Sequence, residues 1–232
     1  MKVLIAAPLR QDLKIFRLYQ DALDRLIVPD GVTVDRFFVV NDCPKVIPHI
    51  RGDYIVHDTL DVYAKTEDAH YWTDENLRKM HTLRNLTIRR ALNGGYDFLL
   101  SVDTDLILRP ETLATLLDNG KDIVSELFWT NGWCNAWMYD QSTGMNQKWK
   151  EPGLYQVGMT GACMLVSRRV LEAGVDYSPI PNLWKALWGE DRHFCIRAAC
   201  LGFELWTDSH CPPEHLYTEQ AYQDYIRRCG NA

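Results

Sequence analysis

The chain has 232 residues, of which 47% are hydrophobic and 24% are charged, and its formal net charge at pH 7 is −6. This is the composition of an ordinary globular protein, and the length suits one α/β domain with a full core. The acidic balance argues against binding of nucleic acid through a broad basic surface, although it leaves a nucleotide ligand open.

The first half of the chain alternates strand-like and helix-like patterns. A stripe of apolar residues predicts an amphipathic helix after the first strand, and Gly94-Gly95 predicts the end of a second, longer helix. In chain order we expect a strand at 2–7, a helix at 12–27, strands at 36–40 and 54–56, a helix at 74–93, a strand that ends before Asp103, a helix between Pro110 and Asn119, and a strand at 123–128. This order predicts an α/β fold with a mostly parallel, twisted sheet and helices on both faces.

The second half is less regular. In 129–156, Trp, Gly, Asn and Gln replace the periodic apolar residues, which predicts either extended loops that line a site or a second, small sheet. After it we expect a strand that leads to Ser167, a helix through Glu172, a helix that starts at Glu190 and stops at Gly202, and a short strand at 203–206. No repeat or linker is visible, so we expect a single domain over residues 1–232.

The cysteines and the apolar runs bear on the compartment. None of the seven cysteines has C-x-x-C spacing, so neither a zinc ribbon nor a thioredoxin-like motif is expected. Cys195 and Cys200 lie in an expected helix and are interpreted as core residues. The apolar run near Met1 is too short for a signal peptide, and no window of about 18 apolar residues predicts a membrane span. We therefore expect a cytoplasmic protein.

Asp103 and Asp105 form the first candidate site. The apolar run before them predicts a buried strand, whose C-terminal end lies where open α/β sheets bind ligands. Side chains at i and i+2 of extended backbone point the same way, and paired carboxylates suit a hard divalent cation that serves phosphates. The motif is short, and an ordinary Asp-rich turn after a strand explains it as well.

Arg84 is out of place in its helix. It falls within an apolar stripe formed by Leu77, Met80, Ile88 and Ala91, where a bare guanidinium is too costly to bury. Two interpretations are open. Arg84 either makes a structural ion pair at the edge of the stripe or, with its neighbour Asn85, reaches a nucleotide or its phosphates.

Two further segments carry candidate residues. Gly158 and Gly161 precede a strand and permit a close approach of backbone to a ligand. Glu190 and Asp191 open a helix, whose dipole favours ionised carboxylates. The acidic pair acts either as a simple helix cap or as a general base aimed into a cleft.

A histidine near the end of the chain is a candidate third metal ligand. His210 and His215 both follow the last expected strand and compete for this role. A surface or packing role is the alternative for either of them.

These segments, taken together and in order, resemble the GT-A glycosyltransferases, especially those similar to glycosyltransferase family 2. The matching motifs are R-N at the start of a pattern R-N-x-x-x-x-x-A (84–91), D-x-D after an apolar strand (103–105), T-G-A leading to an arginine (160–168), E-D followed by R and G-F (190–203), and D followed seven residues later by H (208–215). No single motif is specific, but the ordered set spans most of residues 2–217. Its last motif favours His215 over His210.

The resemblance implies a Rossmann-like GT-A fold in which residues 1–128 bind a nucleotide sugar and residues 129–232 bind an acceptor. It implies a hexosyltransferase-type enzyme that moves a sugar from a UDP- or GDP-sugar to a hydroxyl acceptor, with inversion. Asp191 is the implied general base, with Glu190 beside it. The implied donor-binding residues are Pro8, Arg10, Asp42, Arg84, Asn85, Asp103, Thr104 and Gly161.

The resemblance also implies a divalent metal and an acceptor wall. Asp103, Asp105 and His215 are the implied ligands of Mn²⁺ or Mg²⁺. The candidates for the acceptor wall are Trp133, Trp137, Trp184 and Trp188.

Four alternatives stay open at this point. A GT-A enzyme can instead retain the configuration of the sugar. A haloacid-dehalogenase-like phosphatase also has D-x-D after a strand, with Asp103 as nucleophile and Asp105 beside it, although its other motifs fit poorly. A sugar-phosphate nucleotidyltransferase calls for a Gly-rich first loop, and residues 6–13 contain no glycine. A carbohydrate-binding protein explains the tryptophans and leaves the ordered acidic residues unexplained.

Overall fold

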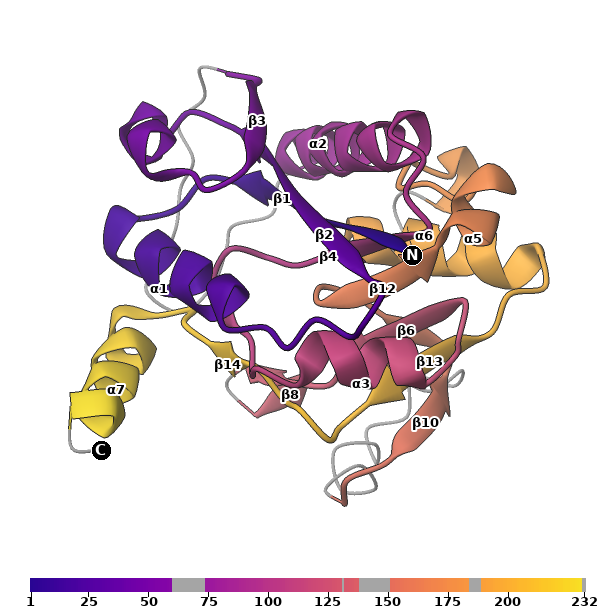
Figure 1. Cartoon of the computed structure of the whole chain (residues 1–232). Helices are drawn as coiled ribbons and strands as arrows, with labels where there is room; N and C mark the ends of the chain where they lie inside the picture. The colour runs from indigo at the N-terminus through magenta and orange to yellow at the C-terminus, as the bar shows by residue number, and fades with distance from the viewer. Residues whose placement is uncertain (60–73, 131, 138–150, 184–188, 231–232) are drawn as a thin grey trace.

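The structure is a computed structural model that describes residues 1–59, 74–130, 132–137, 151–183 and 189–230 (Figure 1). The strands of its main sheet are β1 (Lys2–Leu9), β2 (Thr33–Val40), β3 (Asp53–Val56), β4 (Phe98–Ser101), β6 (Ile123–Glu126), β10 (Leu154–Val157), β12 (Met164–Ser167) and β13 (Leu205–Asp208). The helices are α1 (Leu13–Asp24), α2 (Asp74–Asn93), α3 (Thr112–Asp118), α5 (Arg168–Glu172), α6 (Glu190–Cys200) and α7 (Glu219–Gly230), with 3-10 turns η1 (Pro44–His49) and η2 (Pro181–Leu183). Six two-residue strands complete the set: β5 (Leu106–Ile107), β7 (Trp129–Thr130), β8 (Trp133–Cys134), β9 (Ala136–Trp137), β11 (Met159–Thr160) and β14 (Glu214–His215).

The eight-stranded sheet has the order β10-β13-β6-β12-β4-β1-β2-β3. β1 pairs in parallel with β2 and β4, β2 with β3, and β6 with β13. β12 is inserted antiparallel between β4 and β6, and β10 pairs antiparallel with β13 at the edge. The expected mostly parallel sheet is confirmed, and both halves of the chain contribute strands to it.

Each face of the sheet has its own apolar core. α2, α5 and α6 pack over one face, and α1 and α3 over the other, as Figure 1 shows. Because successive side chains of a strand point to opposite faces, β1 supplies Leu4 and Ala6 to the first core and Val3, Ile5 and Ala7 to the second. Burial on both faces explains why this strand is apolar at nearly every position.

Two helix boundaries illustrate what ends a helix here. α2 ends where Gly95 adopts φ +68°, a conformation that favours glycine, so the expected range 74–93 is confirmed. α1 ends at Asp24, three residues before the expected Ile27. The amide of Ile27 instead donates to the carbonyl of Pro110, 2.8 Å away, so the chain leaves the helix to contact the segment before α3 on the same face of the sheet.

Other expectations differ in detail. The last sheet strand starts at Leu205 rather than Phe203, because the amide of Phe203 still bonds to the carbonyl of Ala198 at 3.0 Å in the cap of α6. α3 begins at Thr112, after Pro110. Cys195 is buried as expected, but Cys200 is exposed at the end of α6, so its assignment to the core is wrong.

The irregular segment 129–156 forms small sheets in its described part. β7 pairs with β8, and β9 pairs with β11, which bears out the small-sheet alternative. Residues 138–150 lie outside the described residues. In the described ranges no helix is long and apolar enough to cross a membrane. All seven cysteines are free thiols.

Candidate active site

The sheet brings the candidate residues to one edge. β1, β2 and β4 run parallel, so the segments after them, with Arg10, Asp42 and Asp103, emerge at their shared C-terminal ends. β12 runs the other way, so its beginning, just after Gly161, lies at the same edge. α6 packs against β11 and places Glu190 next to this edge.

Arg84 lies at the centre of the site, with a side chain only 4% exposed. Its Nε donates to Glu190 Oε1 at 2.7 Å. Its Nη2 donates to Asp103 Oδ1 and Oδ2 at 2.9 and 3.2 Å, and its Nη1 donates to Ser101 Oγ at 3.3 Å. One guanidinium thus joins the D-x-D segment to the E-D segment. Because carboxylates balance its charge, this arginine is tolerated in the apolar stripe of α2.

The charge of Arg84 is permanent in this setting. Burial works against it, but the carboxylates of Asp103, Glu190 and Asp191 outweigh burial and hold the pKa of Arg84 well above its ordinary value. The observed contacts match the structural ion pair of the two interpretations. Direct contact of Arg84 with a nucleotide stays a prediction.

Glu190 and Asp191 begin α6, as expected, and differ in their surroundings. Glu190 is buried and paired with Arg84. Asp191 is half-buried as a residue, but its Oδ1 is enclosed and makes no hydrogen bond within the described residues. Gly161 packs directly on this carboxylate, and a Cβ at position 161 would overlap it. The glycine is therefore needed for close approach to Asp191 rather than to a ligand alone.

The helix dipole does not keep Asp191 ionised, contrary to the expectation from its position. The pKa of Asp191 is raised to about 8, chiefly by burial; the charge of Arg84 opposes this rise, and the charges of Glu190 and Asp103 contribute to it. The favourable field at a helix N-terminus is worth about 0.3–1 kcal/mol at an exposed site, less than the cost of desolvating a carboxylate. The raised pKa makes the carboxylate form of Asp191 a stronger base, and this form, which increases as the pH rises toward 8, is the one that can accept a proton.

Asp105 and His215 form a second pair at the edge. β14 pairs with β5, which sets His215 opposite Leu106 and brings its Nε2 to 3.5 Å from Asp105 Oδ2. The other ring nitrogen, Nδ1, is 2.7 Å from Thr130 Oγ1, which fixes the ring. His210 instead contacts Asp208, with Nδ1 2.9 Å from Oδ1. Of the two histidines, His215 is the one beside the D-x-D segment.

The donor set suits a divalent ion that shares its coordination with a substrate. Within the described ranges no three His, Cys, Asp or Glu side chains lie close enough to hold an ion by themselves. Asp103 faces Arg84, which leaves Asp105 and His215 as the adjacent pair. Mg²⁺-type sites commonly use one or two protein carboxylates plus phosphates and water, and a fixed imidazole is compatible with Mn²⁺. The residues fit such an ion, and the role of Asp103 as a direct ligand stays a prediction.

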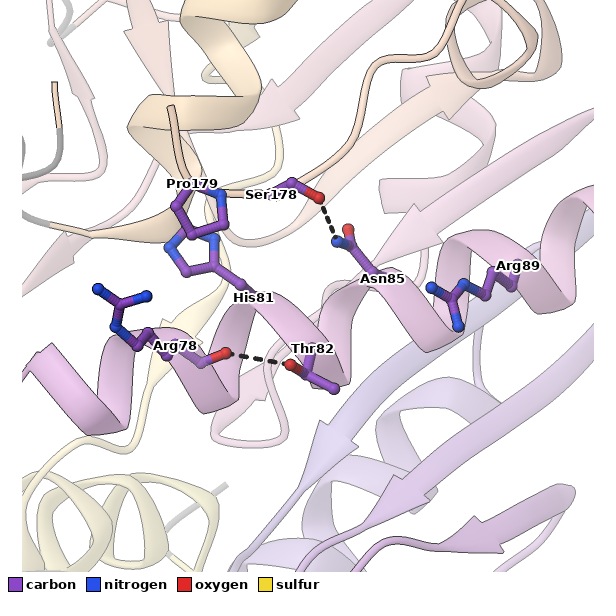
Figure 2. A pocket seen from close by; sticks show the side chains of 7 residues that line it. All are labelled: Arg78, His81, Thr82, Asn85, Arg89, Ser178 and Pro179. Atoms are coloured by element: carbon purple, nitrogen blue, oxygen red, sulfur yellow. Dashed lines mark hydrogen bonds between the residues drawn. The ribbon is translucent and has the colours of Figure 1, made fainter. Parts of the chain in front are cut away.

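Asn85 has structural hydrogen-bond partners, and Thr104 is buried. Asn85 Oδ1 accepts the amide of Tyr177 at 2.8 Å, and its Nδ2 donates to Ser178 Oγ at 3.1 Å (Figure 2). Thr104, between the two aspartates, is buried. Asn85 thus ties α2 to the loop that leads toward α6, and nucleotide contacts by Asn85 or Thr104 stay predictions.

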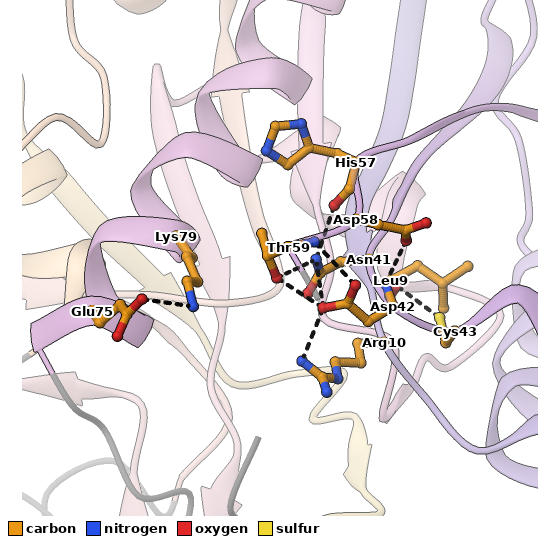
Figure 3. A network of polar contacts seen from close by, with 10 residues as sticks. All are labelled: Leu9, Arg10, Asn41, Asp42, Cys43, His57, Asp58, Thr59, Glu75 and Lys79. Carbon is orange, nitrogen blue, oxygen red and sulfur yellow. Dashed lines mark hydrogen bonds and ion pairs between the residues drawn. The ribbon is translucent and has the colours of Figure 1, made fainter. Parts of the chain in front are cut away.

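A polar network follows the ends of β1, β2 and β3 (Figure 3). Asp42, at φ +49°, accepts the amide and the hydroxyl of Thr59 at 3.0 and 2.8 Å. Arg10 Nη1 is 3.5 Å from the same carboxylate, and the amide of Asp42 donates to Asp58 at 2.9 Å. Pro8 lies in β1 and is half-buried. Arg10 and Asp42 therefore meet, as required of residues that serve one donor site.

The tryptophans divide into described and undescribed ones. Trp133 is 66% exposed in β8, and Trp137 in β9 lies under the guanidinium of Arg192, 5.0 Å from its ring centre. Trp184 and Trp188 lie outside the described residues. An acceptor wall of all four stays a prediction.

Sequence reasoning missed several supporting residues. Ser101 and Thr130 contact Arg84 and His215 through hydroxyl groups, and Thr59 completes the Asp42 network. Thr59 follows the expected third strand, so its position at the edge of a parallel sheet was a usable signal. Thr130 had no such signal, because its role depends on the fold of the irregular segment.

Two mammalian proteins are similar to the chain in sequence. It is 28% identical over 170 residues to the inactive glycosyltransferase 25 family member 3 of Homo sapiens, covering 67% of this chain and 27% of that protein. It is 29% identical over 151 residues to the probable inactive glycosyltransferase 25 family member 3 of Bos taurus, covering 60% and 25%. The chain thus spans about a quarter of the length of these relatives. No protein-family model matches it.

Solved structures are similar in fold. S. aureus TarS 1–349 in complex with UDP has a TM-score of 0.58 at 15% identity, covering 92% of this chain and 59% of that one. The mannosyltransferase PcManGT from Pyrobaculum calidifontis, in complex with GDP-Man and Mn²⁺, has a TM-score of 0.56 at 13% identity, covering 97% and 60%. CMP:2-keto-3-deoxy-manno-octonic acid synthetase with CTP has a TM-score of 0.57 at 14% identity, covering 100% and 99%. The α/β sheet with its inserted antiparallel strand is the GT-A fold, and the chain is similar in structure to GT-A glycosyltransferases.

Proposed function

We propose that the chain is a metal-dependent glycosyltransferase that moves a sugar from a UDP- or GDP-sugar to a hydroxyl acceptor with inversion. The observation that carries the proposal is the buried cluster in which Arg84 links Asp103 to Glu190, next to Asp191. The cluster lies at the C-terminal edge of the sheet, where open α/β proteins bind ligands. The complexes of TarS with UDP and of the mannosyltransferase with GDP-Man support the same class of donor.

In the proposed reaction Asp191 accepts the proton of the acceptor hydroxyl as that oxygen attacks the anomeric carbon. The new glycosidic bond forms on one face of the sugar while the bond to the nucleoside diphosphate breaks on the other, which inverts the configuration. Glu190, bound to Arg84, fixes the first turn of α6 and so positions Asp191. Asp105 and His215 would hold a Mn²⁺ or Mg²⁺ ion, which would supply positive charge for the departing diphosphate.

Three alternatives remain in view. The mammalian relatives are named inactive, so a donor-binding protein without transfer is one of them. A nucleotidyltransferase is favoured by the likeness to the synthetase, which covers nearly the whole of both chains. A phosphatase with Asp103 as nucleophile is disfavoured, because two contacts from Arg84 draw electron density from that carboxylate.

The test is a screen of nucleotide sugars with Mn²⁺, scored by released product. We expect a nucleoside diphosphate to be released from at least one UDP- or GDP-sugar, and the anomeric configuration of any glycoside formed separates inversion from retention. Release of pyrophosphate from a nucleoside triphosphate and a sugar acid would instead favour the nucleotidyltransferase. Release of inorganic phosphate from sugar phosphates would favour the phosphatase.

The metal role has its own variant. Asp105→Ala should abolish Mn²⁺-dependent binding of UDP or GDP in calorimetry, because the carboxylate adjacent to His215 is lost. Asp30→Ala removes an exposed aspartate outside the site and serves as the control. Unchanged nucleotide binding by Asp105→Ala would contradict the proposed metal site.

A further inference from the structure

A cavity of about 350 Å³ lies on the side of α2 that carries Arg78, Thr82, Asn85 and Arg89. Figure 2 shows Arg78 and Arg89 along α2 at opposite ends of the pocket. Ser178 and Pro179 lie across from the helix. The lining includes Asn85 but none of Asp103, Asp105 and Asp191, so this pocket is separate from the catalytic carboxylates.

The spacing along α2 explains the shared side. Positions 78, 82, 85 and 89 are separated by four, three and four residues, so all four lie on one stripe of the helix. Eleven residues make three turns and a rise of about 16 Å, which separates the two arginine positions along the pocket. Arg84 lies off this stripe and contacts the catalytic carboxylates instead.

Arg89 brings a positive charge to the pocket in a chain of net charge −6. His81 adds no charge near neutral pH, because burial lowers its pKa to about 4. The carboxylate of Asp176, two residues before Ser178, is occupied by Arg197 at 3.0 Å and by both the amide and the hydroxyl of Ser178. Glu75, near the start of α2, pairs with Lys79 at 3.3 Å.

Arg89 is the decisive residue. It is exposed, and within the part of the chain that the structure describes it makes no ion pair or hydrogen bond. Its neighbour Arg90, by contrast, pairs with Asp53 at 2.6 Å. An uncompensated guanidinium over a cavity with hydroxyl and amide groups is suited to a phosphate or a carboxylate.

The size of the cavity indicates a small molecule. A volume of about 350 Å³ falls at the lower end of the range of ligand pockets, about 300–1,000 Å³. We infer that this pocket binds an oxyanion-bearing ligand of monosaccharide size, with its anionic group on Arg89 and its hydroxyl groups toward Thr82, Asn85 and Ser178. This site goes beyond the proposed transfer reaction and does not depend on it.

The wall of the pocket is tied to the helix that carries Asp191. Arg197 of α6 donates to the carbonyl of Ser178 at 2.9 Å, and the amide of Ile180 donates to His193 Nδ1 of α6 at 3.0 Å. A ligand held between α2 and residue 178 therefore contacts a segment fixed to α6.

The test measures binding to the full chain in metal-free buffer of low ionic strength, so that a diphosphate site needing a metal contributes nothing. The probes are glucose 6-phosphate, glucuronate and uncharged glucose, followed by NMR titration or calorimetry. We expect glucose 6-phosphate, glucuronate or both to bind and glucose not to bind; which of the two anions binds more tightly separates phosphate from carboxylate.

Substitutions test whether the anion binds in this pocket. Arg89→Gln should weaken binding of the anion at least tenfold. Arg17→Gln removes an exposed helical arginine from α1 and should leave binding unchanged. Absence of binding by both anions, equal binding by glucose, or equal affinities in Arg89→Gln and wild type would each overturn the inference. Mn²⁺-dependent binding of UDP or GDP to Arg89→Gln is measured in parallel, so loss of the proposed donor site is read separately.

Discussion

The two sides of α2 use arginine in opposite ways. Arg84 is buried, and carboxylates of Asp103 and Glu190 occupy its guanidinium. Arg89 is exposed beside a cavity and has no partner within the described residues. Burial makes the difference, because a buried guanidinium must be paired permanently, whereas water stabilises an exposed one until a ligand arrives. The same residue type therefore organises one site and is available for binding at the other.

We expect the largest effect, on the free energy of unfolding, from a substitution of Arg84, and almost none from the same substitution of Arg89. Arg84→Met leaves Asp103, Glu190 and Asp191 without their counter-charge and should lower the free energy of unfolding by about 3–5 kcal/mol. Arg89→Met on the same helix should change it by no more than about 0.5 kcal/mol. Urea unfolding of both variants checks this. Equal effects would contradict the distinction between the two sides.

Asp191→Asn tests the chemistry of the buried side. Asparagine keeps the size of the side chain but cannot accept the proton, so sugar transfer should fall by on the order of 10² or more with donor affinity little changed. The rate of transfer and the dissociation constant of the donor are measured for both proteins. Transfer near the wild-type rate would remove Asp191 from the mechanism.

Gly161→Ala tests the close packing around that carboxylate. The added Cβ overlaps Asp191, so the carboxylate or the backbone has to move, at a cost of about 1–3 kcal/mol in stability. The same substitution at Gly230 meets open space and is the control. Thermal unfolding of the two variants gives the comparison; a fully stable Gly161→Ala protein would show that Asp191 is free to move.

His81 also lines the cavity beside Arg89 and should give an effect on stability that depends on pH. Its Nδ1–H donates to the carbonyl of Tyr177, and burial lowers its pKa from 6.5 to about 4. Between these values the unfolded chain binds more protons than the folded one, so stability falls as the pH drops from about 6.5 to 4. His81→Asn should flatten that dependence, with one pKa unit worth about 1.4 kcal/mol. Unfolding curves of wild type and variant at pH 4, 5, 6 and 7 measure it; parallel curves would count against a neutral His81.

The fold and several candidate residues of the site followed from local sequence patterns. Apolar periodicity indicated the helices and strands, because burial on one or both faces dictates side-chain spacing. Parallel strands place their C-terminal ends at one edge, so the position of Asp103 after an apolar strand was enough to assign it to that edge, whereas Asp42 was assigned only by the resemblance to GT-A glycosyltransferases. The apolar stripe around Arg84 was likewise enough to show that this arginine needed a partner.

The partners themselves were decided only by the tertiary structure. Arg84 meets Glu190 across 106 residues of sequence, and His215 rather than His210 meets Asp105 because β14 pairs with β5. The protonation of Asp191 also escaped the sequence, since a helix N-terminus favours the ionised form and only the packing of Gly161, Glu190 and Arg84 around it sets the opposing desolvation. Local patterns report which side chains are buried, whereas ion pairs and pKa values depend on which distant groups share that burial.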